Sequence, residues 1–278
     1  RGFVNFGNPR VAYSDYGGKV LSGDRTIGIS TFSLAKKPNA SYITGESSQM
    51  EFDPRCFNWN YIGEDTTLWL SKDNGANYSP VYHFNDKVTS VEVAWSNPEV
   101  IYVATWPSWW GTKHIYRSSD AGNTWVEITP TNINGQDWIP YDITVSSYDE
   151  NTLWIARTSM YGGVQDAIGY EVFKSIDGGQ NWMLQHNEPN GETPLFAVYF
   201  ADAQNGIAVG GFSYTFETSD GGQSWRQRTL VEDSYDDFHL NDLFADKKGN
   251  VYIPAEFGTV YKSVDRGRNW KPIETGYD

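Results

Sequence analysis

The 278-residue sequence is poor in cysteine, in charged side chains and in long apolar runs. Its single cysteine, Cys56, excludes an internal disulfide framework. No run of about 18 apolar residues exists that could span a membrane. The four histidines lack the spacing of metal ligands and no glycine-rich phosphate loop is present, so we expect neither a metal nor another cofactor. The net charge of −14 argues against nucleic acid or an anionic membrane as a partner.

Aromatic side chains are what the sequence has in abundance. They make up 16% of the residues, with 12 Trp and 18 Tyr, whereas charged residues make up only 20%. This balance favours many half-buried strands over disorder. A chain of this length can bury a sizeable core as one all-β domain. It begins at Arg1 without Met or a signal-like segment, so we expect a mature or excised portion of a longer protein.

One eight-residue box, Ser/Thr-x-Asp-x-Gly-x-x-aromatic, occurs five times. In a tight turn between two strands, the Asp carboxylate and the hydroxyl accept backbone N–H groups, Gly supplies a positive φ, and the aromatic ring packs under the corner. We therefore predict a structural role for the five box aspartates, which are Asp73, Asp120, Asp177, Asp220 and Asp265.

A strand–turn–strand pattern precedes each box, and a third and a fourth strand flank it. The template is 88–104, and the pattern is predicted again at 29–45, 141–157, 196–211 and 240–255. The box aspartates are 47, 57, 43 and 45 residues apart, which is the length of a four-stranded blade. The sequence thus predicts an all-β chain of four-stranded antiparallel blades.

The box resembles the Asp-box, or BNR repeat, of β-propellers, which sialidases, xyloglucanases, sortilin-type receptors and photosystem assembly factors carry. This resemblance implies a single β-propeller domain over 1–278. We expect about six blades, at 1–26, 27–85, 86–130, 131–188, 189–232 and 233–278. The first is a degenerate copy whose fourth strand is missing or merged into the next blade. Two alternatives stay open, a closed six-bladed ring and part of a ring of seven or more blades.

In propellers of this superfamily the box turns face away from the ligand, and the loops after second and fourth strands form the working face. In this sequence these loops include 46–65, 106–111 and 159–168, and they carry many aromatic and acidic residues. Flat rings beside carboxylates suit a neutral glycan. The alternative for any single ring is that it packs a loop onto its blade. The predicted substrate-binding residues are Trp59, Tyr61, Trp106, Trp109, Trp110, Trp138 and Tyr161.

The stretch Asp15-Tyr-Gly-Gly18 resembles the Asp-x-Gly-Gly stretch of xyloglucanases, where the Asp serves as a catalytic acid or base. The resemblance implies the same role for Asp15. A second carboxylate, Asp166 or Asp137, would have to lie within about 5 to 9 Å. The alternative is a turn without catalysis, as in other Asp-box proteins. The enzymes also have two seven-bladed propellers, and this chain is less than half as long.

Two functions follow as hypotheses. The first is an extracytoplasmic propeller, secreted, cell-surface or periplasmic, that binds a polysaccharide or oligosaccharide. If catalytic, it is a glycoside hydrolase acting on a neutral β-glucan such as xyloglucan. The second is a non-catalytic propeller, sortilin-like or photosystem-assembly-factor-like, that binds a protein partner on the same face. A sialidase is disfavoured, because Arg10, Arg55 and Arg157 lack the context of a carboxylate-binding arginine triad.

Overall fold

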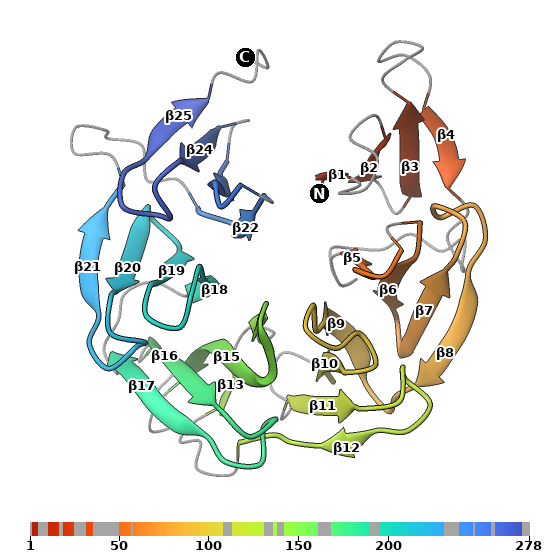
Figure 1. Cartoon of the computed structure of the whole chain (residues 1–278), viewed down its shortest axis with the longest axis horizontal. Coiled ribbons are helices and arrows are strands. Elements are labelled where there is room, and N and C mark those ends of the chain that lie inside the picture. Colours follow the sequence, from red (N-terminus) through yellow and green to blue (C-terminus); the bar gives the residue numbers. More distant parts are fainter. Residues whose placement is uncertain are drawn as a thin grey trace. The chain divides into compact units, whose positions relative to one another are not determined.

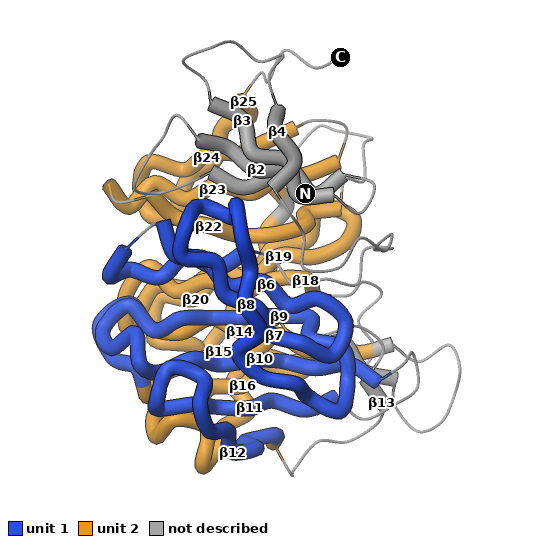
Figure 2. Tube along the Cα trace, turned by 90° about the vertical axis from the view of Figure 1, so that its right-hand side faces the viewer, with its two compact units in different colours: residues 1–129, 147–150 blue, residues 130–146, 151–278 orange. Residues whose placement is uncertain are grey.

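The computed structural model describes the backbone of residues 2–4, 11–16, 19–24, 32–35, 50–56, 58–107, 113–130, 136–137, 142–160, 168–188, 195–230, 239–246, 248–256 and 259–273. Its strands form six antiparallel sheets (Figure 1). The chain divides into two compact units, which Figure 2 colours separately. Unit 1 comprises residues 1–129 and 147–150, and unit 2 comprises residues 130–146 and 151–278.

Unit 1 contains three four-stranded sheets. The first sheet consists of β1 (Gly2–Val4), β2 (Val11–Tyr16), β3 (Lys19–Asp24) and β4 (Phe32–Ala35). The second consists of β5 (Glu51–Phe52), β6 (Asn60–Glu64), β7 (Thr67–Ser71) and β8 (Ser79–His83). The third consists of β9 (Lys87–Val93), β10 (Ile101–Trp106), β11 (His114–Ser118) and β12 (Val126–Glu127).

Unit 2 contains the other three sheets, although β15 begins at two residues of unit 1. The fourth sheet consists of β13 (Gln136–Asp137), β14 (Asp142–Ser146), β15 (Asp149–Met160), β16 (Ile168–Ser175) and β17 (Met183–Glu188). The fifth consists of β18 (Leu195–Phe200), β19 (Gly206–Gly210), β20 (Tyr214–Thr218) and β21 (Arg226–Thr229). The sixth consists of β22 (Phe244–Ala245), β23 (Val251–Pro254), β24 (Val260–Ser263) and β25 (Lys271–Ile273).

In five of the six sheets consecutive strands are hydrogen-bonded neighbours, as expected for propeller blades, whereas in the fourth sheet β13 and β14 both pair with β15. Each box turn joins the third strand to the fourth, so it lies at the same end of the sheet as the turn between the first and second strands. We call this end of a sheet the box end and the opposite end the loop end. The prediction of an all-β chain of four-stranded antiparallel blades is confirmed for five sheets, and the fourth sheet has five strands.

The first two blades differ from the expectation. Residues 32–35 pair with β3 and supply the fourth strand of the first sheet, with Val20 opposite Ala35. The prediction that this strand is missing or merged into the next blade is wrong, because 32–35, the described part of the predicted pair 29–45, belongs to the first sheet. The second blade instead takes its first two strands from β5 and β6, so the described residues of 46–65 include two strands and are not one loop at the loop end. Alternation identified the strand 32–35, but it does not specify which neighbour a strand pairs with.

The core lies between neighbouring sheets. In unit 2, Trp154 of β15 stacks on Phe200 of β18 with ring centroids 3.9 Å apart. In unit 1, Val88 and Val91 of β9 pack in one cluster with Tyr61 and Leu68 of the second sheet. Burying one such side chain fully contributes about 1.5 to 3 kcal/mol. The sheets are thus held face to face by apolar packing, which leaves their two ends for polar groups.

Candidate functional site

The five boxes share one hydrogen-bonded turn. In the third, Gly179 N–H donates to Ser175 Oγ at 2.8 Å, and that hydroxyl donates to Asp177 Oδ1 at 2.8 Å. Asn181 closes the turn, its backbone N–H reaching Oδ1 at 2.9 Å and its amide reaching Oδ2 at 2.7 Å. Gly179 has a φ of 88°. The hydroxyl, the carboxylate and the glycine thus take the places expected of them in a tight turn, and both carboxylate oxygens are engaged within it.

These donors keep the box carboxylates ionised. The hydrogen bonds lower the pKa of Asp177 from its usual range, with the Asn181 amide as the largest cause. In the fourth box the Ser224 hydroxyl is the largest cause, and the pKa of Asp220 falls to about 2. A carboxylate with so low a pKa is a poor proton donor near neutral pH. The low pKa and the internal hydrogen bonds of these carboxylates fit the structural role predicted for the boxes.

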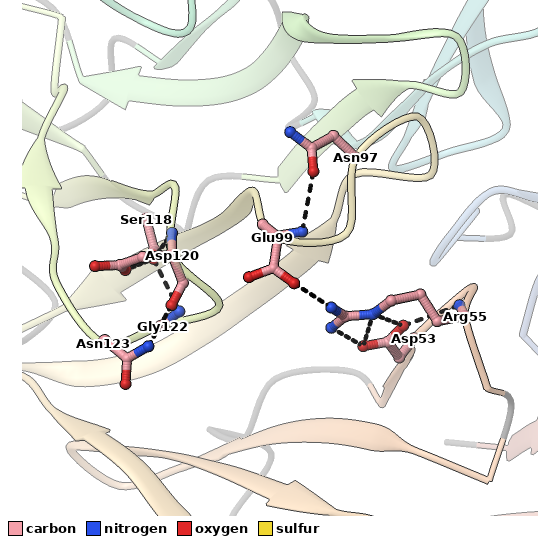
Figure 3. A network of polar contacts seen from close by, with 8 residues as sticks. All are labelled: Asp53, Arg55, Asn97, Glu99, Ser118, Asp120, Gly122 and Asn123. Carbon is pink, nitrogen blue, oxygen red and sulfur yellow. Dashed lines mark hydrogen bonds and ion pairs between the residues drawn. The ribbon is translucent and has the colours of Figure 1, made fainter.

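Ion pairs connect the second and third sheets at the box end of unit 1 (Figure 3). The Arg55 guanidinium donates to both oxygens of the fully buried Asp53 and also reaches Glu99 of the third sheet. The backbone N–H of Ala121, inside a box, donates to the Glu99 carbonyl at 2.9 Å. Arg55 is thus committed to a contact between two sheets.

Three predicted substrate-binding rings lie in the described part of unit 1. Trp59 is at the box end, where the Lys72 ammonium lies 4.3 Å from its ring centroid. Tyr61 is 1% exposed, and burial raises its pKa to about 12. Trp106, at the loop end of β10, is 8% exposed, with Lys113 Nζ 5.3 Å from its ring. Each of the three is engaged by its own sheet or its neighbour, and they do not share one end.

The other predicted site residues are less fully placed. Asp15 lies in β2 opposite Val20, and Asp137 lies in β13 opposite Ser159, and both are described by backbone alone. Five further residues lie outside the described residues, and these are Asp166, Trp109, Trp110, Trp138 and Tyr161. The predicted carboxylate pair therefore stays a prediction.

The loop end of the fourth sheet carries buried ionisable groups. Arg157 of β15 is fully buried and donates through Nη1 to Glu171 of β16. The carboxylate of Glu171 thereby compensates the positive charge of Arg157. Tyr170 lies opposite Glu188 in the ladder. Its pKa rises to about 12, first through burial and then through the charges of Glu188 and Tyr214. The phenol is therefore a hydrogen-bond donor at neutral pH.

An aromatic cluster follows at the loop ends of the fifth and sixth sheets. Phe212 stands in the turn between β19 and β20, and it is 45% exposed. The His239 ring lies between Phe212 and Phe196, with centroids 5.4 Å and 5.7 Å away. The backbone N–H of His239 donates to Glu256 Oε2 at 3.1 Å. Sequence reasoning did not single out Phe212 or Glu256. A signal for Phe212 exists in the sequence, because Phe-Ser occupies a two-residue loop between predicted strands where Asn-Gly is usual.

In the described ranges, no three His, Cys, Asp or Glu side chains gather closely enough to hold a metal ion. In the same ranges no helix has the length and apolar character needed to cross a membrane.

Known proteins match this chain at the level of repeat and fold. A family model described as photosynthesis system II assembly factor YCF48, of the BNR type, matches residues 184–276. A xyloglucanase from Paenibacillus sp. is 25% identical over 194 residues, covering 57% of this chain and 18% of the enzyme. This chain therefore spans about a fifth of the length of that curated relative.

Two solved enzymes share the fold across nearly the whole chain. An ancestral GH74 enzyme superposes with a TM-score of 0.71 at 14% identity, covering 99% of this chain and 38% of the other. The GH74 xyloglucanase from Xanthomonas campestris gives 0.64 at 11% identity, covering 99% of this chain and 45% of the other. Identities this low establish the fold alone.

Proposed function

We propose that the loop ends of this β-propeller recognise a neutral glycan, such as a β-glucan of the xyloglucan kind. The observation that carries the proposal is the similarity in sequence to a xyloglucanase over more than half of the chain. The loop ends supply fitting chemistry, since in unit 2 the exposed Phe212 ring and the Glu256 carboxylate both contact His239. Aromatic faces and carboxylates together bind sugars well.

The proposal includes a location outside the cytoplasm, in a secreted, cell-surface or periplasmic protein. A polysaccharide is too large to cross a membrane unaided, so a protein that binds it must meet it on the outer side. The acidic composition fits a neutral ligand better than an anionic one.

The enzyme form of the proposal assigns Asp15 as general acid or base, with Asp137 or Asp166 as the second carboxylate. Trp109, Trp110, Trp138 and Tyr161 would then hold the glycan beside them. A separation of about 5 Å between the two carboxyl groups would retain the anomeric configuration, and one of about 6.5 to 9.5 Å would invert it.

The substitution Asp15→Asn tests this form of the proposal. The amide keeps the size and hydrogen bonding of the side chain but removes proton transfer, so hydrolysis of xyloglucan should fall by about 10² to 10⁴-fold while binding persists. Reducing-end release would be the measurement. Asp24→Asn, in β3 of the same sheet opposite Val11, is the matched control and should keep full activity. Equal activity of Asp15→Asn and its parent would reject Asp15.

A second candidate function is favoured by one observation, the match of residues 184–276 to an assembly-factor family. In that case the same loop ends bind a protein or peptide and no bond is cleaved. The two candidates separate cleanly, because a binding propeller shows no hydrolysis across a polysaccharide panel and binds a polypeptide with an affinity that Asp15→Asn leaves unchanged.

A further inference from the structure

The turn between β19 and β20 holds an unusual backbone conformation. Phe212 has a φ of 53° and Ser213 a φ of 58°, and Tyr214 N–H donates to the Gly211 carbonyl at 3.1 Å. Two left-handed residues in a two-residue loop define a type I′ turn, which Asn-Gly fills at least cost. Among the residues that the structure describes, this is the only pair of consecutive non-glycine residues with positive φ. The turn is therefore strained.

The strain is not compensated by burial of the Phe212 ring. Ser213 is 4% exposed, but Phe212 remains 45% exposed, although an aromatic ring that only stabilised the fold would be buried. Strained residues of this kind cluster at ligand-binding positions, where the surrounding structure holds them in place. The exposed ring of Phe212 is thus a reason to look for a ligand at this turn.

His239 connects the ring to a carboxylate. His239 contacts Phe212 edge to face, and its Nδ1 has no hydrogen-bond partner in the described part of the chain. Glu256 accepts the His239 backbone N–H through Oε2, whereas no donor from the described ranges reaches its Oε1. An apolar ring and a carboxylate with an open acceptor position therefore contact the same residue, His239.

The supporting backbone is fixed from both sheets. Leu240, fully buried, donates its N–H to the Gly210 carbonyl at 3.0 Å and forms a bridge with Ala255. These contacts join the segment that carries His239 to the end of β19 and the end of β23. The ring and the carboxylate are thus presented by a preorganised frame, which lowers the entropic cost of binding.

We propose that the Phe212 ring is a stacking subsite for one pyranose ring of a neutral sugar, with Glu256 Oε1 accepting a sugar hydroxyl. This inference rests on the proposed function and locates one sugar-binding subsite in the structure. A sugar uses both features, because its C–H face packs on an aromatic ring while its hydroxyls donate to a carboxylate. An anionic sugar is excluded by the charge of Glu256. A basic peptide is the competing ligand, and the test distinguishes it.

The strain gives a test with two readouts of opposite sign. The double variant Phe212→Asn/Ser213→Gly removes the ring and installs the preferred turn residues, so its melting temperature should rise while affinity for xyloglucan heptasaccharide falls roughly three- to tenfold in calorimetry. Phe212→Ala should lose similar affinity. The matched control is Phe244→Ala, which removes a 42% exposed ring that stacks on Tyr252 in the sixth sheet and should leave affinity unchanged.

The possible results separate the subsite from the function. If the parent binds the heptasaccharide and both Phe212 variants bind it equally well, the subsite is rejected and the proposed function survives. If the parent binds no neutral glycan, both are rejected. Phe212-dependent binding of an arginine-rich peptide, without binding of the sugar, would also overturn the subsite and identify a polypeptide site. Loss of sugar affinity with a raised melting temperature supports the subsite, since a purely structural role cannot produce it.

Discussion

At the scale of single residues, the boxes behave as their sequence predicts because every contact in them is local. Ser71, Asp73 and Gly75 are within four residues of one another, and Gly75 N–H reaches Ser71 Oγ at 2.8 Å. The motif alone therefore specifies its hydrogen bonds. The exposure of a single aromatic ring, by contrast, depends on residues distant in the sequence. Tyr61 and Trp106 resemble surface aromatics in sequence, but neighbouring strands cover them.

The lowered pKa of the box aspartates predicts how stability depends on pH. Asp220 titrates at about 2 in the folded state and has an ordinary value of 3.8, so the unfolded chain binds more protons between these two values. Its stabilising contribution is complete above about pH 4 and is lost as the pH falls towards 2. The melting temperature of Asp220→Asn should therefore fall less steeply over this range than that of the parent. Asp86→Asn, outside the boxes, is the control, and identical slopes for parent and Asp220→Asn would contradict the prediction.

At the scale of elements, the sequence predicts strands better than it predicts their partners. The template pair around 88–104 and the pairs in unit 2 were identifiable because a short turn joins strands that face each other. Residues 32–35 have the same alternation but pair with β3 across a longer connection. The number of residues between two strands, and not their composition, therefore determined which predicted strand pairings were correct.

Close packing between neighbouring sheets makes a further prediction at Gly63. A Cβ atom built on this residue of β6 would overlap the side chain of Val88 in β9, and Val88 is fully buried. Gly63→Ala should therefore lower the free energy of unfolding by about 1 to 3 kcal/mol, measured by urea denaturation. Adding Val88→Ala to that variant should restore part of the loss by opening space. A Gly63→Ala variant as stable as its parent would show that the two sheets can separate without cost.

At the scale of the whole molecule, repetition made the fold predictable and variation concealed the site. Five boxes at blade-length spacing predicted a propeller, and the sheets and the solved structures with the same fold confirm it. The loop ends differ from blade to blade, so no repeat indicates which of their residues converge. Phe212 shows the consequence, because its significance lies in a backbone conformation and an exposed ring that composition does not encode.

Titration calorimetry with neutral glucan oligosaccharides tests the central claim, that loop-end aromatics recognise a sugar. We predict saturable binding of a xyloglucan oligosaccharide by the parent. Trp109→Ala/Trp110→Ala should bind several-fold more weakly, since each stacking ring contributes on the order of 1 kcal/mol, and its melting temperature should be unchanged. Absence of binding to every neutral glycan offered, or full affinity in the double variant together with a melting temperature several degrees lower, would contradict the account.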